Sequence, residues 1–182
     1  MVILVDDADR ELGAAEKIAV HRGGRLHRAF SIFLVDDECK ILLQRRALTK
    51  YHSGGLWANT CCGHPRPGES TLAAAKRRLW EEMGLSASLN FEFRSRYRLA
   101  VGGGMWENEL VHVFFGRSIR PPRPDPREVM DVAHASLESL LLMAATQSGA
   151  MAAWLRHYLT RQNTLIEGGI GNFHVRGRPN QE

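Results

Sequence analysis

The chain has few cysteines and no long apolar run. No stretch approaches the ~20 consecutive apolar residues that a helix needs to cross a bilayer, so we expect no membrane span. The first residues lack a basic segment and soon reach Asp6 and Asp7, which argues against a signal peptide. The three cysteines, two of them adjacent at Cys61 and Cys62, do not suit a disulfide framework. We therefore expect a protein of the reducing cytoplasm.

The chain also lacks a strong excess of charge of either sign. Its net charge is +4 over 182 residues, and its basic residues form no dense stripe or known nucleic-acid motif. This mild positive charge is compatible with binding of a small anionic ligand. An ordinary solvated surface would explain the same charge. We expect no nucleic-acid or membrane partner and, by default, a monomer. The length fits one domain, 1–160, with a polar, Gly-rich tail, 161–182, that we expect to be partly disordered.

Hydrophobic patterning predicts both strands and helices. Short apolar runs predict strands at 2–5, 32–35, 41–43 and 110–115, of which the middle two form a hairpin. Helical spacing predicts helices at 70–83, 137–145 and 150–159. Residues 50–68, rich in Gly, Pro, His, Cys and Trp, are predicted to form a loop, and 121–126 a stiff connection.

The clearest helix, 70–83, can be capped by Ser70 and ended by Gly84. Its apolar stripe consists of Leu72, Ala75, Leu79 and Met83. Arg78 and Glu82 are four residues apart and share another face. A guanidinium beside a carboxylate can hold a diphosphate and a Mg²⁺ together. An ordinary surface ion pair has the same spacing, so both interpretations stay open.

The segment 63–85 resembles the Nudix signature. That signature is a Gly, five residues, a Glu, seven residues and then Arg-Glu-hydrophobic-x-Glu-Glu-x-Gly-hydrophobic, and the chain matches it from Gly63 through Glu69 and Arg77 to Leu85. One position differs: Arg78 stands where Nudix hydrolases carry a Glu that helps to bind metal. The resemblance implies a Nudix-like α+β fold, a single domain with a mixed β-sheet core flanked by helices. Arg78 argues against simple pyrophosphate hydrolysis.

A second group of ligand-type residues is spread along the chain: His21, His27, His64, Glu107 and Glu109. In extended chain Glu107 and Glu109 point the same way. Three imidazoles and two carboxylates are too many for a tetrahedral structural zinc site. They suit a five- or six-coordinate Mn²⁺ or Mg²⁺, or a distorted Zn²⁺. A single histidine is more often an ordinary polar residue, so the spacing alone does not decide.

Cys62 stands in a polar sequence, before Gly63 and His64. A buried cysteine is often only a small hydrophobic side chain. If Arg46 and Lys50 lie near it, their charge would instead make the thiol reactive.

Several separated blocks are similar to bacterial type I isopentenyl-diphosphate isomerases. The blocks are 25–31, 44–50, 55–65, 68–70, 97–98 and 107–109, within a resemblance that covers roughly 2–160. These enzymes interconvert isopentenyl and dimethylallyl diphosphate in isoprenoid biosynthesis, by protonation and deprotonation through a tertiary carbocation. The resemblance implies the same isomerase activity here. The alternative is a Nudix-type pyrophosphohydrolase.

The resemblance also implies a role at each matching position. One divalent ion (Mn²⁺, Mg²⁺ or Zn²⁺) would be held by His21, His27, His64, Glu107 and Glu109, with Cys62 in the same metal loop. Glu82 would bind a Mg²⁺ that also holds the diphosphate. The catalytic residues would be Cys62, Glu109 and Tyr97. The substrate contacts would be Lys17, Arg46, Lys50, Arg78 and Trp154, although Trp57 and Trp106 are further candidates to shield a carbocation.

Overall fold

Strand β3 (His27–Val35) runs through the centre of the fold and contributes to both of its main cores. The computed structural model describes residues 1–117 and 120–176. Successive side chains of a strand point to opposite faces. Phe33 therefore packs in one apolar cluster, while Ile32 and Leu34 pack in the other.

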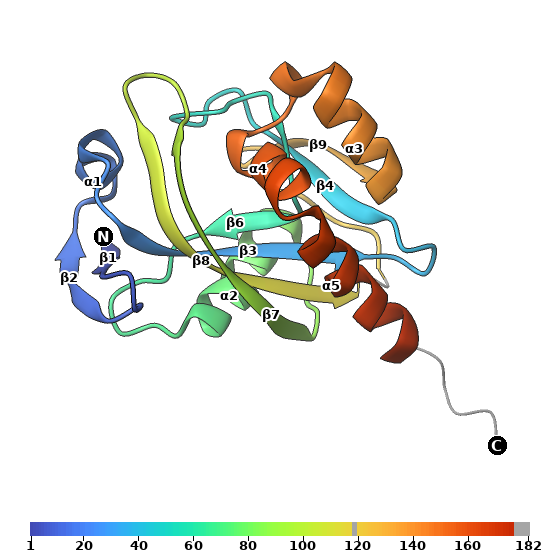
Figure 1. The fold of residues 1–182 in the computed structure, drawn as a ribbon, viewed down its shortest axis with the longest axis horizontal. Coiled ribbons are helices and arrows are strands. Elements are labelled where there is room, and N and C mark those ends of the chain that lie inside the picture. Colours follow the sequence, from blue (N-terminus) through green and yellow to red (C-terminus); the bar gives the residue numbers. More distant parts are fainter. Residues whose placement is uncertain (118–119, 177–182) are drawn as a thin grey trace.

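β3 is the hub of a mixed sheet (Figure 1). It pairs in parallel with β8 (Trp106–Arg117) and antiparallel with β1 (Val2–Val5), β4 (Ile41–Arg46) and β6 (Cys61–Gly63). The outer strands are β2 (Glu11–Ala15) beside β1, β7 (Leu89–Ala100) beside β8, and β5 (Trp57–Ala58) and β9 (Val129–Ala135) beside β4.

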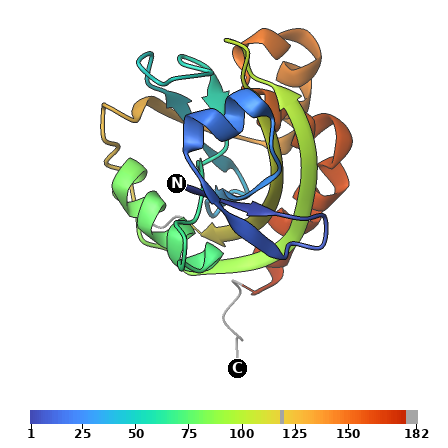
Figure 2. The ribbon, with the colours of Figure 1, turned by 90° about the vertical axis from the view of Figure 1, so that its left-hand side faces the viewer.

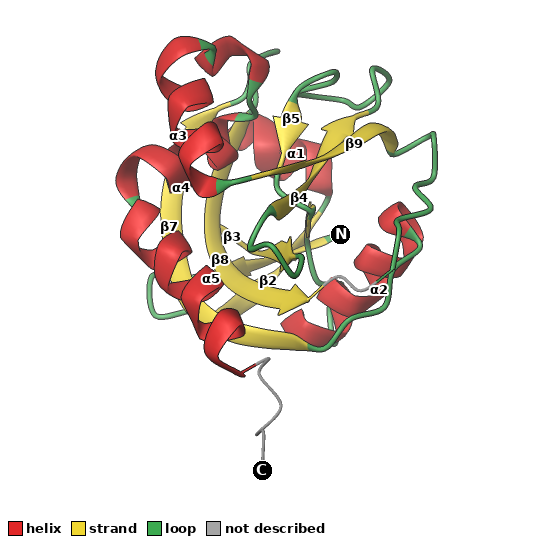
Figure 3. Cartoon of the chain, turned by 90° about the vertical axis from the view of Figure 1, so that its right-hand side faces the viewer, coloured by secondary structure: helices red, strands yellow, loops and turns green. Residues whose placement is uncertain are grey.

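Helices cover both faces of this sheet. They are α1 (Lys17–Gly23), α2 (Thr71–Met83), α3 (Leu137–Thr146), the 3₁₀ turn η1 (Ser148–Ala150), α4 (Ala153–Arg161) and α5 (Asn163–Arg176). Figures 2 and 3 show α2 on one side of the sheet and α3, α4 and α5 on the other. The predicted α+β architecture, a mixed sheet flanked by helices, is confirmed.

The predicted elements lie within observed ones, with three differences. The expected loop 50–68 contains the short strands β5 and β6. The helix predicted at 150–159 begins only at Ala153, after η1. α1, β2, β7 and β9 were not predicted, because short or polar outer elements carry little hydrophobic periodicity.

Helix α2 begins and ends where its caps predict. The Ser70 hydroxyl accepts a hydrogen bond from the Ala73 N–H at 3.2 Å, and Gly84 takes the left-handed conformation that ends the helix, with φ 63°. Leu79 and Met83 are fully buried as expected, but Leu72, in the first turn, is 38% exposed. The apolar stripe therefore begins one turn later than predicted.

The segment after residue 162 differs from the expected disordered tail. It forms α5, and its Ile166 and Ile170, one turn apart, are buried against the core. Gly169 lets the helix approach the Phe115 ring, because a Cβ there would lie 2.5 Å from that ring. One of the glycines that suggested disorder, Gly169, therefore permits close packing. Residues 177–182 of the expected tail lie outside the described residues.

Among the described residues, no helix combines the length and apolar character that a bilayer crossing requires.

Candidate active site

The strand register brings the acidic residues of β8 beside β3 and β7. His27 of β3 lies opposite Glu109 in the parallel pair, and Tyr97 of β7 lies opposite Glu109 in the antiparallel pair. The Tyr97 hydroxyl donates a hydrogen bond of 2.7 Å to Glu109 Oε2. Glu107, two residues before Glu109, faces the same side of the strand.

Helix α1 and the end of β6 add two further imidazoles. The Glu16 carboxylate caps α1 by accepting hydrogen bonds from two N–H groups of its first turn, and the helix carries His21, which is fully buried. His64 directly follows β6. Ligand atoms of five residues lie within 4.8 Å of one another: His21, His27, His64, Glu107 and Glu109. The structure thus brings together all five predicted ligands, called here the His/Glu cluster.

Backbone contacts orient two of the three imidazole rings. His21 Nδ1 lies 2.7 Å from the Lys17 carbonyl oxygen, and His27 Nδ1 lies 2.9 Å from that of Arg25. A carbonyl only accepts, so each Nδ1 carries the hydrogen and each Nε2 is left to face the cluster.

Burial and neighbouring charges set the protonation of the cluster. Burial and the nearby Lys17 cation hold the pKa of His64 well below its ordinary value, which leaves a neutral ring that can bind a cation. Burial alone would lower the pKa of His21, but the Glu107 carboxylate outweighs it and raises that pKa. For Glu109 the effect of burial is the opposite, since burial alone would raise the pKa of a carboxyl group. The contacts of Glu109 with Glu107 and His27 outweigh burial and lower this pKa, so Glu109 is a carboxylate.

The donor set fits a divalent cation. His27 Nε2 lies 3.1 Å from His64 Nε2 and 3.4 Å from Glu109 Oε1. His21 Nε2 and Glu107 Oε2 lie 3.5 Å apart, and neither finds a hydrogen bond among the described residues. Buried polar atoms without a partner are unfavourable. A cation between these nitrogens and oxygens would satisfy them, and the chemistry of the set suits Mn²⁺, Mg²⁺ or a distorted Zn²⁺ site.

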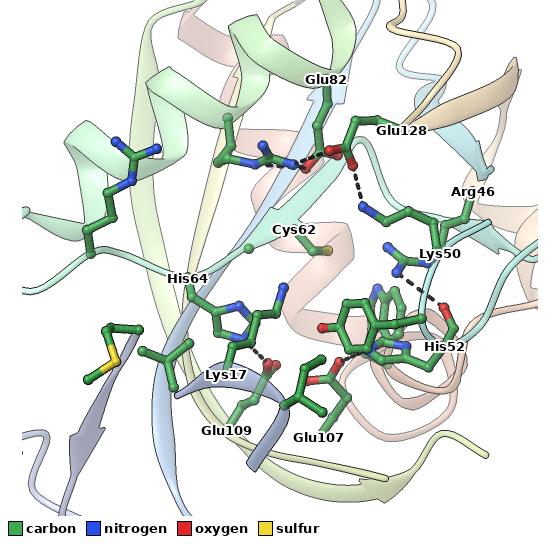
Figure 4. Close-up of a pocket in the computed structure, with 18 of the residues that line it drawn as sticks. Lys17, Arg46, Lys50, His52, Cys62, His64, Glu82, Glu107, Glu109 and Glu128 are labelled. Carbon is green, nitrogen blue, oxygen red and sulfur yellow. Dashed lines mark hydrogen bonds and ion pairs between the residues drawn. The ribbon is translucent and has the colours of Figure 1, made fainter. Parts of the chain in front are cut away.

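Cys62 lies in the wall of the same cavity (Figure 4). Its thiol donates to Asn59 Oδ1 at 3.1 Å and lies 3.5 Å from Ser31 Oγ. Ser31 Oγ also accepts a hydrogen bond from Tyr158 at 3.0 Å. Desolvation raises the pKa of Cys62 to about 12. The thiol thus keeps its proton at neutral pH, contrary to the cationic activation suggested by the sequence.

The predicted substrate-binding cations line this cavity together with Trp154. They are Lys17, Arg46, Lys50 and Arg78. Lys17 Nζ lies 4.7 Å from the centre of the Tyr51 ring, and burial lowers its pKa. The Arg46 guanidinium lies 5.2 Å from the centre of the Trp154 ring. The four cations form a basic mouth to the cavity.

Glu82 and Arg78 form a largely buried ion pair and not an ordinary surface pair. Arg78 Nη2 donates to Glu82 Oε1 at 2.5 Å, and the Glu82 side chain is only 5% exposed. Gln44 Nε2 donates to Glu82 Oε2 at 3.1 Å. Arg78 and Glu82 both line the cavity, and Figure 4 shows Glu82 in the part away from the labelled His/Glu cluster residues.

The cavity has a volume of about 470 Å³. Of the three tryptophans proposed to shield a cation, Trp154 lines it and is 3% exposed. Trp57 and Trp106 are not among the described residues that line the cavity. This arrangement favours Trp154 over the other two.

Sequence reasoning missed three residues around the cavity. His52 lies 2.8 Å from Glu107, Glu128 pairs with both Lys50 and Arg78, and Gln44 supports Glu82. His52 comes from the segment expected to be a loop, and Glu128 lies just after the expected stiff connection 121–126. The sequence did show a histidine, His52, close to the predicted site residue Lys50, and a carboxylate at Glu128. No local sequence pattern, however, shows that such side chains point into a cavity.

Comparisons with known proteins identify the fold family. Residues 25–158 match the family model described as the NUDIX domain. A structure of DR0079 from Deinococcus radiodurans superposes with a TM-score of 0.71 at 20% identity, covering 88% of this chain and 97% of that one. A Nudix hydrolase from M. smegmatis, RenU, superposes at 0.59 with 18% identity, covering 92% and 95%. At such identities these likenesses show the Nudix fold alone.

Curated relatives are considerably more similar in sequence. Isopentenyl-diphosphate Delta-isomerase 1 of Aromatoleum aromaticum is 46% identical over 160 residues, which cover 88% of this chain and 90% of the relative. Proteins named isopentenyl-diphosphate Delta-isomerase from Pectobacterium atrosepticum and Burkholderia multivorans are each 44% identical. The two alignments cover 85% and 88% of this chain, and 87% and 91% of the respective relatives.

Proposed function

The chain belongs to the NUDIX-domain family and, within it, to the group of the isopentenyl-diphosphate Delta-isomerases, and on this premise we propose that it interconverts isopentenyl and dimethylallyl diphosphate. The observation that carries the proposal is that a thiol, Cys62, and a buried carboxyl group, Glu109, line one cavity. Two proton-transfer groups at one small cavity are what the movement of a double bond requires.

In the proposed reaction, one member of the Cys62/Glu109 pair gives a proton to the terminal carbon of the double bond. The other removes a proton from the carbon two positions away, so the double bond moves and no net proton is consumed. Between the two steps the substrate is, or approaches, a tertiary carbocation. In the reverse direction the two residues exchange roles. Tyr97 holds Glu109 through its 2.7 Å hydrogen bond.

The His/Glu cluster would hold one divalent ion, through the Nε2 atoms of its histidines and the carboxylates of Glu107 and Glu109. When bound, that ion supplies positive charge, which perturbs the pKa of the Glu109 carboxylate. We propose Mn²⁺, Mg²⁺ or Zn²⁺ for this site. A Mg²⁺ would sit between Glu82 and the diphosphate.

The basic mouth would bind the diphosphate, through Lys17, Arg46, Lys50 and Arg78. This anchorage is remote from the reacting carbons and fixes their position. Trp154 would face the developing carbocation, exclude water and stabilise it by roughly 0.5–2 kcal/mol through cation–π attraction. We also propose that the protein acts in the cytoplasm as a monomer. Its partner would be a small diphosphate, with no nucleic-acid or membrane partner.

The isomerase is favoured over a Nudix-type pyrophosphohydrolase. The relatives that cover most of the chain are named as isomerases, and the cationic Arg78 occupies a position where the hydrolase signature has a metal-binding Glu. Hydrolysis also has no use for a thiol such as Cys62.

The direct test is an assay of the purified chain with isopentenyl diphosphate and Mg²⁺. We expect dimethylallyl diphosphate to form without release of phosphate, and activity to disappear after chelation. Release of phosphate or pyrophosphate without isomerisation, or cleavage of nucleoside diphosphate compounds, would support the hydrolase instead.

A further inference from the structure

We propose that His52 is a positioning residue for the His/Glu cluster: it holds the Glu107 carboxylate so that one oxygen faces the bound cation. This inference rests on the divalent-metal site proposed above. It assigns a role to a side chain that lies outside the group of five ligands, at the tip of the connection between β4 and β5.

The two oxygens of Glu107 face different partners. Oε1 lies 2.8 Å from His52 Nε2, an ion-pair distance without the alignment of a hydrogen bond, and this contact is drawn as a dashed line in Figure 4. Oε2 lies 3.5 Å from His21 Nε2, on the side of the cluster. The side chains of His52 and Glu107 are 2% and 6% exposed, so water competes little for either contact. His52 thus faces Oε1, while Oε2 faces His21.

The connection 47–56 holds the His52 ring rigidly. The Arg46 guanidinium donates to the His52 carbonyl oxygen at 3.3 Å. The ring packs edge-to-face against Tyr51 and Trp154, with centroids 4.3 and 5.8 Å away. The turn is closed tightly, since a Cβ on Gly54 would lie 2.6 Å from the Leu48 carbonyl oxygen. The protein's own contacts therefore position the imidazole.

A fixed imidazole on one oxygen limits how a carboxylate can bind a cation. A free carboxylate can rotate and coordinate through either oxygen or both. When His52 holds Oε1, Glu107 presents only Oε2 to the cation. The Glu107 side chain then loses less conformational freedom when the cation binds. Contacts of this kind, one step removed from the metal, typically change metal affinity by about 10–100-fold.

The test is titration of the metal-stripped full chain with Mn²⁺, followed by calorimetry and electron paramagnetic resonance. In His52→Asn the shorter amide cannot reach Glu107, and we expect roughly 10–100-fold weaker Mn²⁺ binding and an altered Mn²⁺ spectrum. In His52→Gln the amide nitrogen reaches about as far as Nε2, and we expect near wild-type affinity. If His52→Asn does not fold, as judged by thermal melting, His52→Leu replaces it.

Two further variants calibrate the measurement. His134→Asn alters an exposed histidine on β9 and should bind Mn²⁺ as the wild type does. His27→Ala removes a proposed ligand and sets the scale of a direct loss. Unchanged affinity and spectrum in His52→Asn, or equal weakening in the Asn and Gln variants, would overturn the role of His52. Failure of the wild type to bind Mn²⁺, and Zn²⁺ or Mg²⁺ titrated in its place, would overturn the metal site itself, and the inference with it.

Discussion

At Cys62 the surroundings, and not the side chain alone, decide the chemistry. Its thiol donates to Asn59 and contacts Ser31, and desolvation keeps its proton in place at neutral pH. The sequence showed this cysteine beside polar and cationic residues. It could not show that packing around the sulfur outweighs those charges, because that packing comes from residues distant in the chain.

We predict that Cys62→Ser folds and binds metal but loses turnover by at least about 100-fold, the usual contribution of a positioned acid or base. A serine hydroxyl fills the same space but is a far weaker acid. The measurement is kcat for isopentenyl diphosphate, with bound metal determined by elemental analysis. Cys39→Ser, outside the cavity, serves as the control. Near wild-type turnover in Cys62→Ser would remove Cys62 from the mechanism.

Glu69, a fixed position of the Nudix signature, has a structural role that can be separated from catalysis. Arg77 donates to both of its carboxylate oxygens, at 2.8 Å each, and this contact lowers the pKa of Glu69 from 4.5 to about 2. The pair ties the loop after β6 to α2, next to the basic mouth.

We predict that Glu69→Gln lowers the free energy of unfolding at pH 7 by about 1–2 kcal/mol, after allowance for partial exposure. Because the folded-state pKa is depressed, this stabilisation is present above about pH 4.5 and is lost as the pH falls toward 2. Urea unfolding of both proteins at neutral and acid pH measures it, with Glu38→Gln as a surface control. A difference that persists at pH 2 would contradict this account.

Among the elements, the strands show most clearly what a sequence can and cannot predict. The apolar runs of β1, β3, β4 and β8 predict strands by themselves. The parallel pairing of β3 with β8, which sets His27 beside Glu109, joins segments about eighty residues apart, and periodicity carries no information about such partners. The resemblance to the isomerases, and not the pattern of the strand, grouped the five residues that the structure brings together.

The connection into β9 brings an acid to the basic mouth. Glu128 forms ion pairs with Lys50 and Arg78, two of the cations proposed for the diphosphate. If these two cations bind the diphosphate as proposed, the Glu128 carboxylate would compete with the substrate for them.

We predict that Glu128→Gln lowers KM for isopentenyl diphosphate by up to about fivefold, since a partly exposed ion pair contributes about 1 kcal/mol or less. The value of kcat should change little, because Glu128 does not contact the proposed proton-transfer groups. Steady-state kinetics at low salt measures both constants, and Glu138→Gln on α3 is the control. A higher KM would show that Glu128 positions the cations and does not compete for them.

On the scale of the whole molecule, the C-terminal helices close one face of the sheet. α4 carries Trp154 into the cavity, and α5 packs behind it against Phe115. Length predicted one domain and helical spacing predicted a helix at 150–159, but the polar, Gly-rich composition of 161–182 suggested partial disorder. The buried Ile166 and Ile170 were the contrary signal.

We predict opposite effects for two neighbouring glycines of α5. Gly169→Leu should destabilise the protein by roughly 1–3 kcal/mol or more, because its side chain would clash with the Phe115 ring. Gly168→Leu, where a Cβ meets nothing within 4 Å, should stabilise it by about 0.5–1 kcal/mol. Thermal melting distinguishes the two. Equal, negligible effects would indicate a segment that does not pack on the core.

The central claim is that this cavity moves a double bond by adding one proton and removing another. The most direct test is incubation with isopentenyl diphosphate and Mg²⁺ in heavy water, followed by NMR of the products. We predict dimethylallyl diphosphate that carries deuterium in its new methyl group. Unlabelled dimethylallyl diphosphate would contradict protonation from groups that exchange with solvent, and release of phosphate without isomerisation would contradict the isomerase itself.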